Sequence, residues 1–146
     1  MSITIISSLY RSEAHLPQFT HHVLTFARAV HQAGVSVHYL PIVNDASSAE
    51  KQAINQLAET IKAEKIGTIT PHFVGRETLY ASWNRGIRLS DKPYFTFWNA
   101  DDIRDADAFV EGYRALEKGA NLVDFRFTGV KSVKRLGLFP ATVHQL

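Results

Sequence analysis

Short apolar segments alternate with longer amphipathic segments along the chain, and this alternation restricts the possible folds more than any other feature of the sequence. Five segments are typical of buried strands: residues 3–9, 35–43, 65–70, 93–98 and 121–127. Pro41 indicates an edge strand or an irregular end for the second segment, and Pro71 closes the third. In the fifth, Val123, Phe125 and Phe127 alternate onto one face.

Amphipathic segments separate these strands and predict helices, because their apolar residues recur every three or four positions. The first helix, expected within residues 13–33, would bury Leu16, Phe19, Val23, Phe26, Ala27 and Val30. Gly34 then stands at a position suited to a left-handed helix cap. The second helix begins at Ser47, which forms a capping-box pattern with Glu50.

Two further helices are expected, one from about Thr78 to Leu89 and one from Asp105 to Gly119. One face of the former carries Leu79, Trp83 and Ile87, and the latter packs Phe109, Tyr113 and Leu116. Strands that alternate with helices form parallel sheets covered by helices. We therefore predict an α/β fold, a three-layer sandwich with a mostly parallel sheet.

The carboxyl-terminal residues differ in charge from the rest of the chain. No Asp or Glu follows Asp124, whereas four basic residues do: Arg126, Lys131, Lys134 and Arg135. We assign residues 1–127 to the α/β domain and residues 128–146 to a basic C-terminal tail of uncertain structure. Such a tail either binds a phosphate or another anion or is simply solvated.

Composition excludes several classes of function. The chain has no cysteine, which excludes disulfides, zinc–thiolate sites and Cys nucleophiles and agrees with a reducing compartment, so we expect a cytoplasmic protein. A net charge of +2 gives no argument for nucleic acid binding. No apolar run reaches the roughly 18 residues of a transmembrane helix. Dinucleotide, P-loop, zinc-hydrolase and serine-hydrolase motifs are missing from the sequence.

Ligands of open parallel sheets bind beyond the carboxyl ends of the strands, so the residues that follow each strand are candidates for binding. Tyr10 follows the first strand and could stack on a base or simply cover the end of the sheet. Asp45 follows the second, where its carboxylate could accept a hydrogen bond from a base or a ribose, or belong to a turn. Arg85, within the third helix, could pair with a phosphate.

Two adjacent carboxylates, Asp101 and Asp102, follow the fourth strand. Carboxylate oxygens suit Mg²⁺ or Mn²⁺, and such an ion usually shares its coordination with substrate phosphates and waters. A bound ion would neutralise the charge that develops on a departing diphosphate. The alternative is that these acids, with Asp105 and Asp107, only favour the start of a helix.

Four motifs, taken in order, resemble the family 2 glycosyltransferases, which have the GT-A fold. Residues 5–13 are similar to the first strand of that family and its P-x-Y-N-x-E turn, and residues 44–47 to its D-D-G-S turn. Residues 80–87 are similar to its A-x-N-x-G-I helix, and residues 94–102 to the strand that carries its D-x-D element. The resemblance covers about residues 3–127.

The resemblance implies a nucleotide-sugar site at the strand ends, with Mn²⁺ or Mg²⁺ as the cofactor. Tyr10 and Asp45 would flank the base and ribose, Asn99 would lie near the ribose or the sugar, and Asp101 with Asp102 would hold the metal. Together with Arg85, the implied nucleotide-sugar-binding residues are Ser8, Tyr10, Glu13, Asp45, Asn99 and Asp101. Ser8 stands where the family usually has proline, and Glu13 lies one position later than in the commonest pattern.

The family also has an acceptor half, in which a carboxylate serves as the general base of inverting transfer, and no such carboxylate is identified here. We therefore expect either a small glycosyltransferase completed by a partner chain or an unusual tail, or a non-catalytic nucleotide-sugar-binding subunit. An unrelated α/β phosphate-binding protein is the third alternative. If half of the family fold is missing, a sheet edge and apolar surface would be exposed, which predicts a homo-oligomer or a partner subunit.

Overall fold

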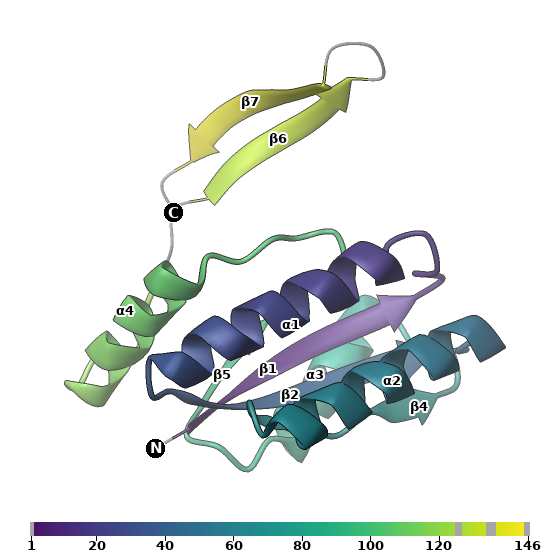
Figure 1. Cartoon of the computed structure of the whole chain (residues 1–146), viewed down its shortest axis with the longest axis horizontal. Helices are drawn as coiled ribbons and strands as arrows, with labels where there is room; N and C mark the ends of the chain where they lie inside the picture. Colours follow the sequence, from purple (N-terminus) through teal and green to yellow (C-terminus); the bar gives the residue numbers. More distant parts are fainter. Residues whose placement is uncertain (1, 125–126, 134–136, 145–146) are drawn as a thin grey trace. The chain divides into compact units, whose positions relative to one another are not determined.

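Five strands in the amino-terminal part of the chain form one sheet, and all of their pairings are parallel (Figure 1). They are β1 (Ser2–Tyr10), β2 (Ser36–Asn44), β3 (Thr68–Ile69), β4 (His72–Val74) and β5 (Tyr94–Phe97). Their order is β3-β2-β1-β5, and β4 pairs with β2 farther along that strand than β3 does. The expected α/β fold with a parallel sheet is confirmed.

The helices of the described residues are α1 (Leu16–Gln32), α2 (Ser48–Glu64), α3 (Leu79–Leu89) and α4 (Ala106–Glu117). Helices α1 and α2 contact each other on one face of the sheet, whereas α3 covers the opposite face, against β1 and β2 (Figure 1). Within the described part of the chain, none of the helices has both the length and the apolar character needed to cross a membrane.

The structure is a computed structural model that describes the backbone of residues 2–124, 127–133 and 137–144, and the side chains of residues 2–124. The chain forms two units, residues 1–110 and 111–146, and the boundary between them falls within α4. The sheet with α1, α2 and α3 belongs to the first unit.

An aromatic core lies between the sheet and α1. The Trp98 ring, directly after β5, meets Phe26 edge-on with the ring centroids 4.9 Å apart, and Phe19 with the centroids 6.1 Å apart. All six α1 side chains that the sequence predicts to be buried are buried. The capping box of α2 is also confirmed, because the Glu50 N–H donates to Ser47 Oγ (3.1 Å) and the Ser47 N–H donates to Glu50 Oε2 (3.0 Å).

Helix α3 packs only part of the apolar face that its sequence presents. Of the three predicted residues, Trp83 packs against the core and stacks on Phe97 with the ring centroids 4.5 Å apart. The buried residues of the helix are Ser82 and Gly86, whereas Leu79 and Ile87 are 45% and 37% exposed. At Gly86 the helix lies so close to β1 that a Cβ atom would collide with Cγ2 of Ile6. This close approach of backbone to strand fixes the side of α3 that faces the sheet.

Replacing Gly86 by alanine is therefore expected to destabilise the fold, although alanine is the better helix former by about 1 kcal/mol. Ile6 is fully buried and cannot move aside freely, and overpacking of this kind costs about 1–3 kcal/mol. We expect a net loss of about 1 kcal/mol in the free energy of unfolding, measured by urea denaturation. Gly75→Ala is the control, because its new Cβ meets nothing within 4 Å. A more stable Gly86→Ala variant would contradict the packing described here.

Pro41 lies in the interior of β2, which is an inner strand of the sheet, so the expectation of an edge strand or an irregular end is wrong. On the side away from β1, β2 pairs with two short strands instead of one continuous strand. The predicted strand at residues 65–70 is reduced to β3, and β4 follows Pro71 as a separate strand. Neither short strand pairs with Pro41. The missing N–H of this proline therefore interrupts no ladder on that side.

The second unit contains an antiparallel pair of strands, β6 (Phe127–Val133) and β7 (Gly137–His144). They occupy the region that the sequence left as a tail of uncertain structure. The predicted strand at residues 121–127 is wrong over residues 121–124, which have no strand structure. Phe125 lies outside the described residues.

Candidate functional site

The order of the strands reverses between β1 and β5. From β1 the chain passes through α1 to β2 and on to β3 and β4 on one side, and β5 lies on the other side of β1 (Figure 1). Open α/β sheets bind their ligands at the carboxyl ends of the strands where the order reverses. The Trp98 N–H still donates to the Ile6 carbonyl (2.9 Å), so residues 99–102 leave the sheet beside β1.

Tyr10 ends β1 and carries two positive charges over its ring. The guanidinium carbons of Arg11 and Arg76 each lie 5.2 Å from the ring centroid. Both arginines are exposed, so neither charge is shielded from solvent or from a ligand. Tyr10, predicted either to stack on a base or to cover the end of the sheet, is thus an aromatic ring in contact with two guanidinium groups, which can bind phosphate.

Two non-glycine residues with left-handed backbone follow neighbouring strands at the same level. Tyr10 pairs with Asn44 in the register of β1 and β2, and the next residues, Arg11 and Asp45, have φ values of 48° and 44°. Such conformations are costly outside glycine and cluster at binding sites, where they aim side chains that a regular strand end would not. Both strands therefore turn away together at this edge of the sheet.

The Asp45 carboxylate is exposed and receives no hydrogen bond from the described residues. Its backbone N–H donates to the Val74 carbonyl (2.9 Å), so the residue closes a turn and keeps its side chain available. Ser8 is half-buried on β1, and Glu13 is exposed in the turn before α1. Both of the roles left open for Asp45, turn and ligand, remain compatible with this geometry.

Asp101 and Asp102 are both exposed. Asn99 Nδ2 donates to Asp102 Oδ2 (3.1 Å), and Trp98 Nε1 donates to the Asp102 carbonyl (3.0 Å), so buried Trp98 holds the backbone of this turn. The Asp101 side chain has no hydrogen bond or ion pair with any described residue. The start of α4 is capped instead by Asp105, whose Oδ1 accepts from the Ala108 N–H (2.8 Å). The capping role that was the alternative for the acidic pair therefore belongs to Asp105.

Arg104 lies close in sequence to the acidic pair but forms no ion pair with it among the described side chains. Its guanidinium donates to the Phe97 carbonyl and to Thr96 Oγ1, and it lies 5.9 Å from the centroid of the Trp98 ring. Burial lowers the pKa of Arg104, and the charge of Asp102 opposes that shift. Arg104 thus occupies neither carboxylate of the acidic pair.

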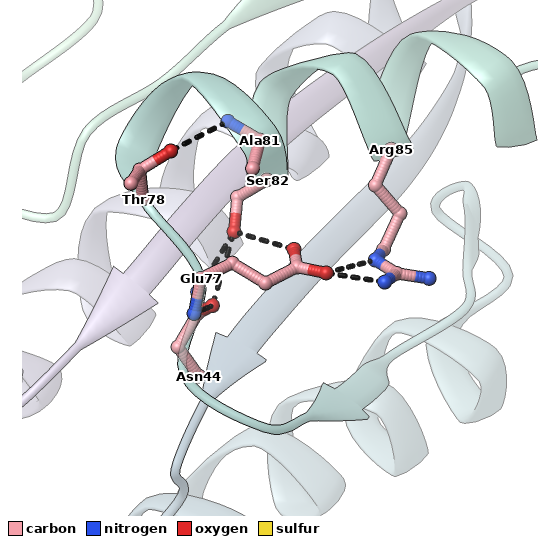
Figure 2. Close-up of polar contacts among 6 residues, drawn as sticks. All are labelled: Asn44, Glu77, Thr78, Ala81, Ser82 and Arg85. Atoms are coloured by element: carbon pink, nitrogen blue, oxygen red, sulfur yellow. Dashed lines mark hydrogen bonds and ion pairs between the residues drawn. The ribbon is translucent and has the colours of Figure 1, made fainter.

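Arg85, predicted to bind phosphate, is held by a carboxylate of its own chain. Its Nε donates to Glu77 Oε1 (2.8 Å), and its Nη2 forms an ion pair with the same oxygen (Figure 2). The hydrogen bond from Arg85 holds the pKa of Glu77 below its ordinary value. Arg76 is the cation that sequence reasoning missed, because β4 was not predicted and its carboxyl end was therefore not searched.

Comparisons with protein-family models, with curated proteins and with solved structures find no match to this chain. The described side chains contain no group of three or more His, Cys, Asp or Glu residues placed to hold a metal ion. Any metal at this edge would therefore need oxygen atoms from a ligand in addition to the two adjacent aspartates.

Proposed function

We propose that the chain binds a nucleoside-diphosphate sugar at the carboxyl edge of its sheet and transfers the sugar to an acceptor hydroxyl, as a glycosyltransferase with a GT-A-like arrangement. The observation that carries the proposal is the pair of exposed carboxylates, Asp101 and Asp102, beside β1 at the point where the strand order reverses. The resemblance of four ordered motifs to family 2 glycosyltransferases supports it.

In this proposal, the nucleoside and the diphosphate of the donor contact different side chains. The base lies against Tyr10 and its guanidinium neighbours, and the Asp45 carboxylate accepts a hydrogen bond from a base N–H or a ribose hydroxyl. Arg11 and Arg76 place positive charge where the diphosphate follows the nucleoside. Arg85 supports this edge through Glu77 rather than by binding phosphate directly.

The acidic pair fits Mg²⁺ or Mn²⁺, because these ions are commonly bound by one or two carboxylates together with waters and substrate phosphates. Asp101, unengaged by described residues, is the principal ligand, and Asp102 is the second, steadied by Asn99. When bound, the ion would stabilise the negative charge on the leaving nucleoside diphosphate.

A second candidate function is that of a non-catalytic nucleotide-sugar-binding subunit. It is favoured by the positions of the last acidic residues, because Glu111 and Glu117 are exposed on α4 and Asp124 is exposed beyond it. None of them follows a strand of the sheet. In this case a partner chain supplies the acceptor side, and the exposed apolar side chains Leu79 and Phe95 belong to its contact.

The donor proposal is tested by thermal unfolding with UDP-, GDP- and dTDP-sugars, each with and without Mn²⁺. A donor at 100 times its Kd stabilises the protein by about 2.7 kcal/mol, a shift of several degrees in Tm. We expect one nucleotide class to give this shift and Mn²⁺ to enlarge it. No shift with any donor would reject both functions. Product release with a panel of acceptor sugars then separates the transferase from the binding subunit.

A further inference from the structure

The loop between β4 and α3 is anchored at both ends by two consecutive residues, the last residue of β2 and the one that follows it. The Asp45 N–H donates to the Val74 carbonyl (2.9 Å), and Asn44 Oδ1 accepts from the Glu77 N–H (3.0 Å). Only residues 75–76 lie between the two anchored positions. The carboxyl end of β2 therefore controls where this short span projects.

Asn44 is the residue that ties the loop to the rest of the fold. It is only 1% exposed, and its side chain hydrogen-bonds to three other segments. Nδ2 donates to the Leu9 carbonyl of β1 (3.2 Å) and to Ser82 Oγ of α3 (2.9 Å), while Oδ1 accepts from the loop. Figure 2 shows this amide between the loop and the first turns of α3. A buried amide with partners on all sides has one orientation, so it holds β1, the loop and α3 in a fixed relation.

The Glu77 side chain continues the network along α3. The Ser82 hydroxyl lies 3.3 Å from Glu77 Oε2 and 3.2 Å from Asn44 Oδ1, so its single proton serves one of these two acceptors. Arg85 binds the same carboxylate from the next turn of the helix (Figure 2). Thr78, between the loop and α3, caps the helix by accepting from the Ala81 N–H (3.2 Å).

The span held in this way carries Arg76, whose guanidinium lies over Tyr10. Tyr10 is the register partner of Asn44, so the ring and the buried amide belong to neighbouring residues at the same level of the sheet. We propose that Asn44 is a positioning residue for nucleotide binding, which acts through Ser82 and Glu77 to keep Arg76 on the Tyr10 ring. Its effect on binding rests on the proposed function, whereas the placement of Arg76 is measurable without a ligand.

The ligand-free test is the NMR shift of the Arg76 side-chain protons, which the Tyr10 ring current displaces from ordinary arginine values. Tyr10→Leu gives the value without a ring. We expect Asn44→Ala to remove at least half of the displacement and Ser82→Ala to reduce it measurably. Thr4→Val is the matched control, because it removes a buried hydroxyl at the opposite end of β1 and should leave the shift unchanged.

The binding test uses UDP, GDP and dTDP without a sugar, together with Mn²⁺ titrations. We expect Asn44→Ala to raise the Kd of the bound nucleotide about tenfold, because the contact that Arg76 makes with the nucleotide is lost. Ser82→Ala should raise it a few-fold, because that contact is only weakened. The factor by which Mn²⁺ raises nucleotide affinity should be the same in these variants as in the wild type, because the acidic pair follows β5 and has no bond to the network.

The outcomes separate the two ideas. If the wild-type protein binds none of the nucleotides, the proposed function is rejected. If it binds one, and the folded variants keep both the Arg76 shift and the wild-type Kd, the role of Asn44 is overturned. Should Asn44→Ala not fold, Ser82→Ala decides alone, because it removes only a hydroxyl from a helix and leaves a good helix former.

Discussion

Asp101→Asn is expected to abolish the Mn²⁺-dependent part of donor stabilisation, so that the Tm with donor is the same with and without Mn²⁺. Asparagine keeps the size of the side chain but lacks the charge and the second oxygen that a hard divalent cation requires. The Asp101 side chain is exposed and makes no bond to described residues, so the variant should fold with unchanged stability, within about 0.5 kcal/mol. The measurement is the Tm with donor, with and without Mn²⁺.

Asp107→Asn is the matched control, because Asp107 is an exposed carboxylate in the first turn of α4 and follows no strand. It should retain the full response to Mn²⁺. A metal-dependent shift of wild-type size in Asp101→Asn would remove this residue from the metal site. Equal losses in both variants would point to a general effect of net charge rather than to coordination.

Trp98→Ala is expected to lower the free energy of unfolding by about 3–5 kcal/mol, the usual loss when a buried tryptophan becomes alanine. The side chain is 1% exposed, packs edge-on against Phe19 and Phe26 of α1, and donates to the Asp102 carbonyl. A cavity would open between α1 and β5, and the turn with the acidic pair would lose its anchor. Urea denaturation followed by circular dichroism measures the change.

Trp98→Phe separates packing from hydrogen bonding at the same position. It keeps an aromatic ring against α1 but cannot donate to the Asp102 carbonyl, and the loss of that bond costs about 1 kcal/mol in addition to a modest packing loss. A loss below about 1 kcal/mol in Trp98→Ala would mean that this ring is not part of the core.

Features that depend on neighbouring residues were predictable from the sequence. The six buried residues of α1 are recognised because apolar residues recur every three or four positions. The capping box of α2 involves only Ser47 and Glu50, which lie one helical turn apart. Gly34 has the expected left-handed backbone, with φ of 79°. The places of Tyr10, Asp45 and the acidic pair at the ends of β1, β2 and β5 were also predictable, because each strand is apolar and the residues after it are polar.

Features that depend on distant partners were not predictable. Pro41 is tolerated inside β2 because the opposite strand is broken, which no residue near the proline reveals. On α3, Gly86 is buried in the packed face and Leu79 and Ile87 are not, because Ile6, eighty positions away, lies against the glycine. Arg85 and Arg76 look alike in sequence, and only the folded loop shows that the first has a carboxylate partner and the second an aromatic ring.

The Arg104 guanidinium also has a consequence for the solution behaviour of the protein. The Trp98 N–H faces β1, so the Phe97 carbonyl of the same peptide faces away from it, toward the outer side of β5. Arg104 donates to that carbonyl and places a cation there. Among the described residues β5 is the last strand of the sheet, and a satisfied acceptor with a charge beside it makes this edge a poor template for pairing with a further strand.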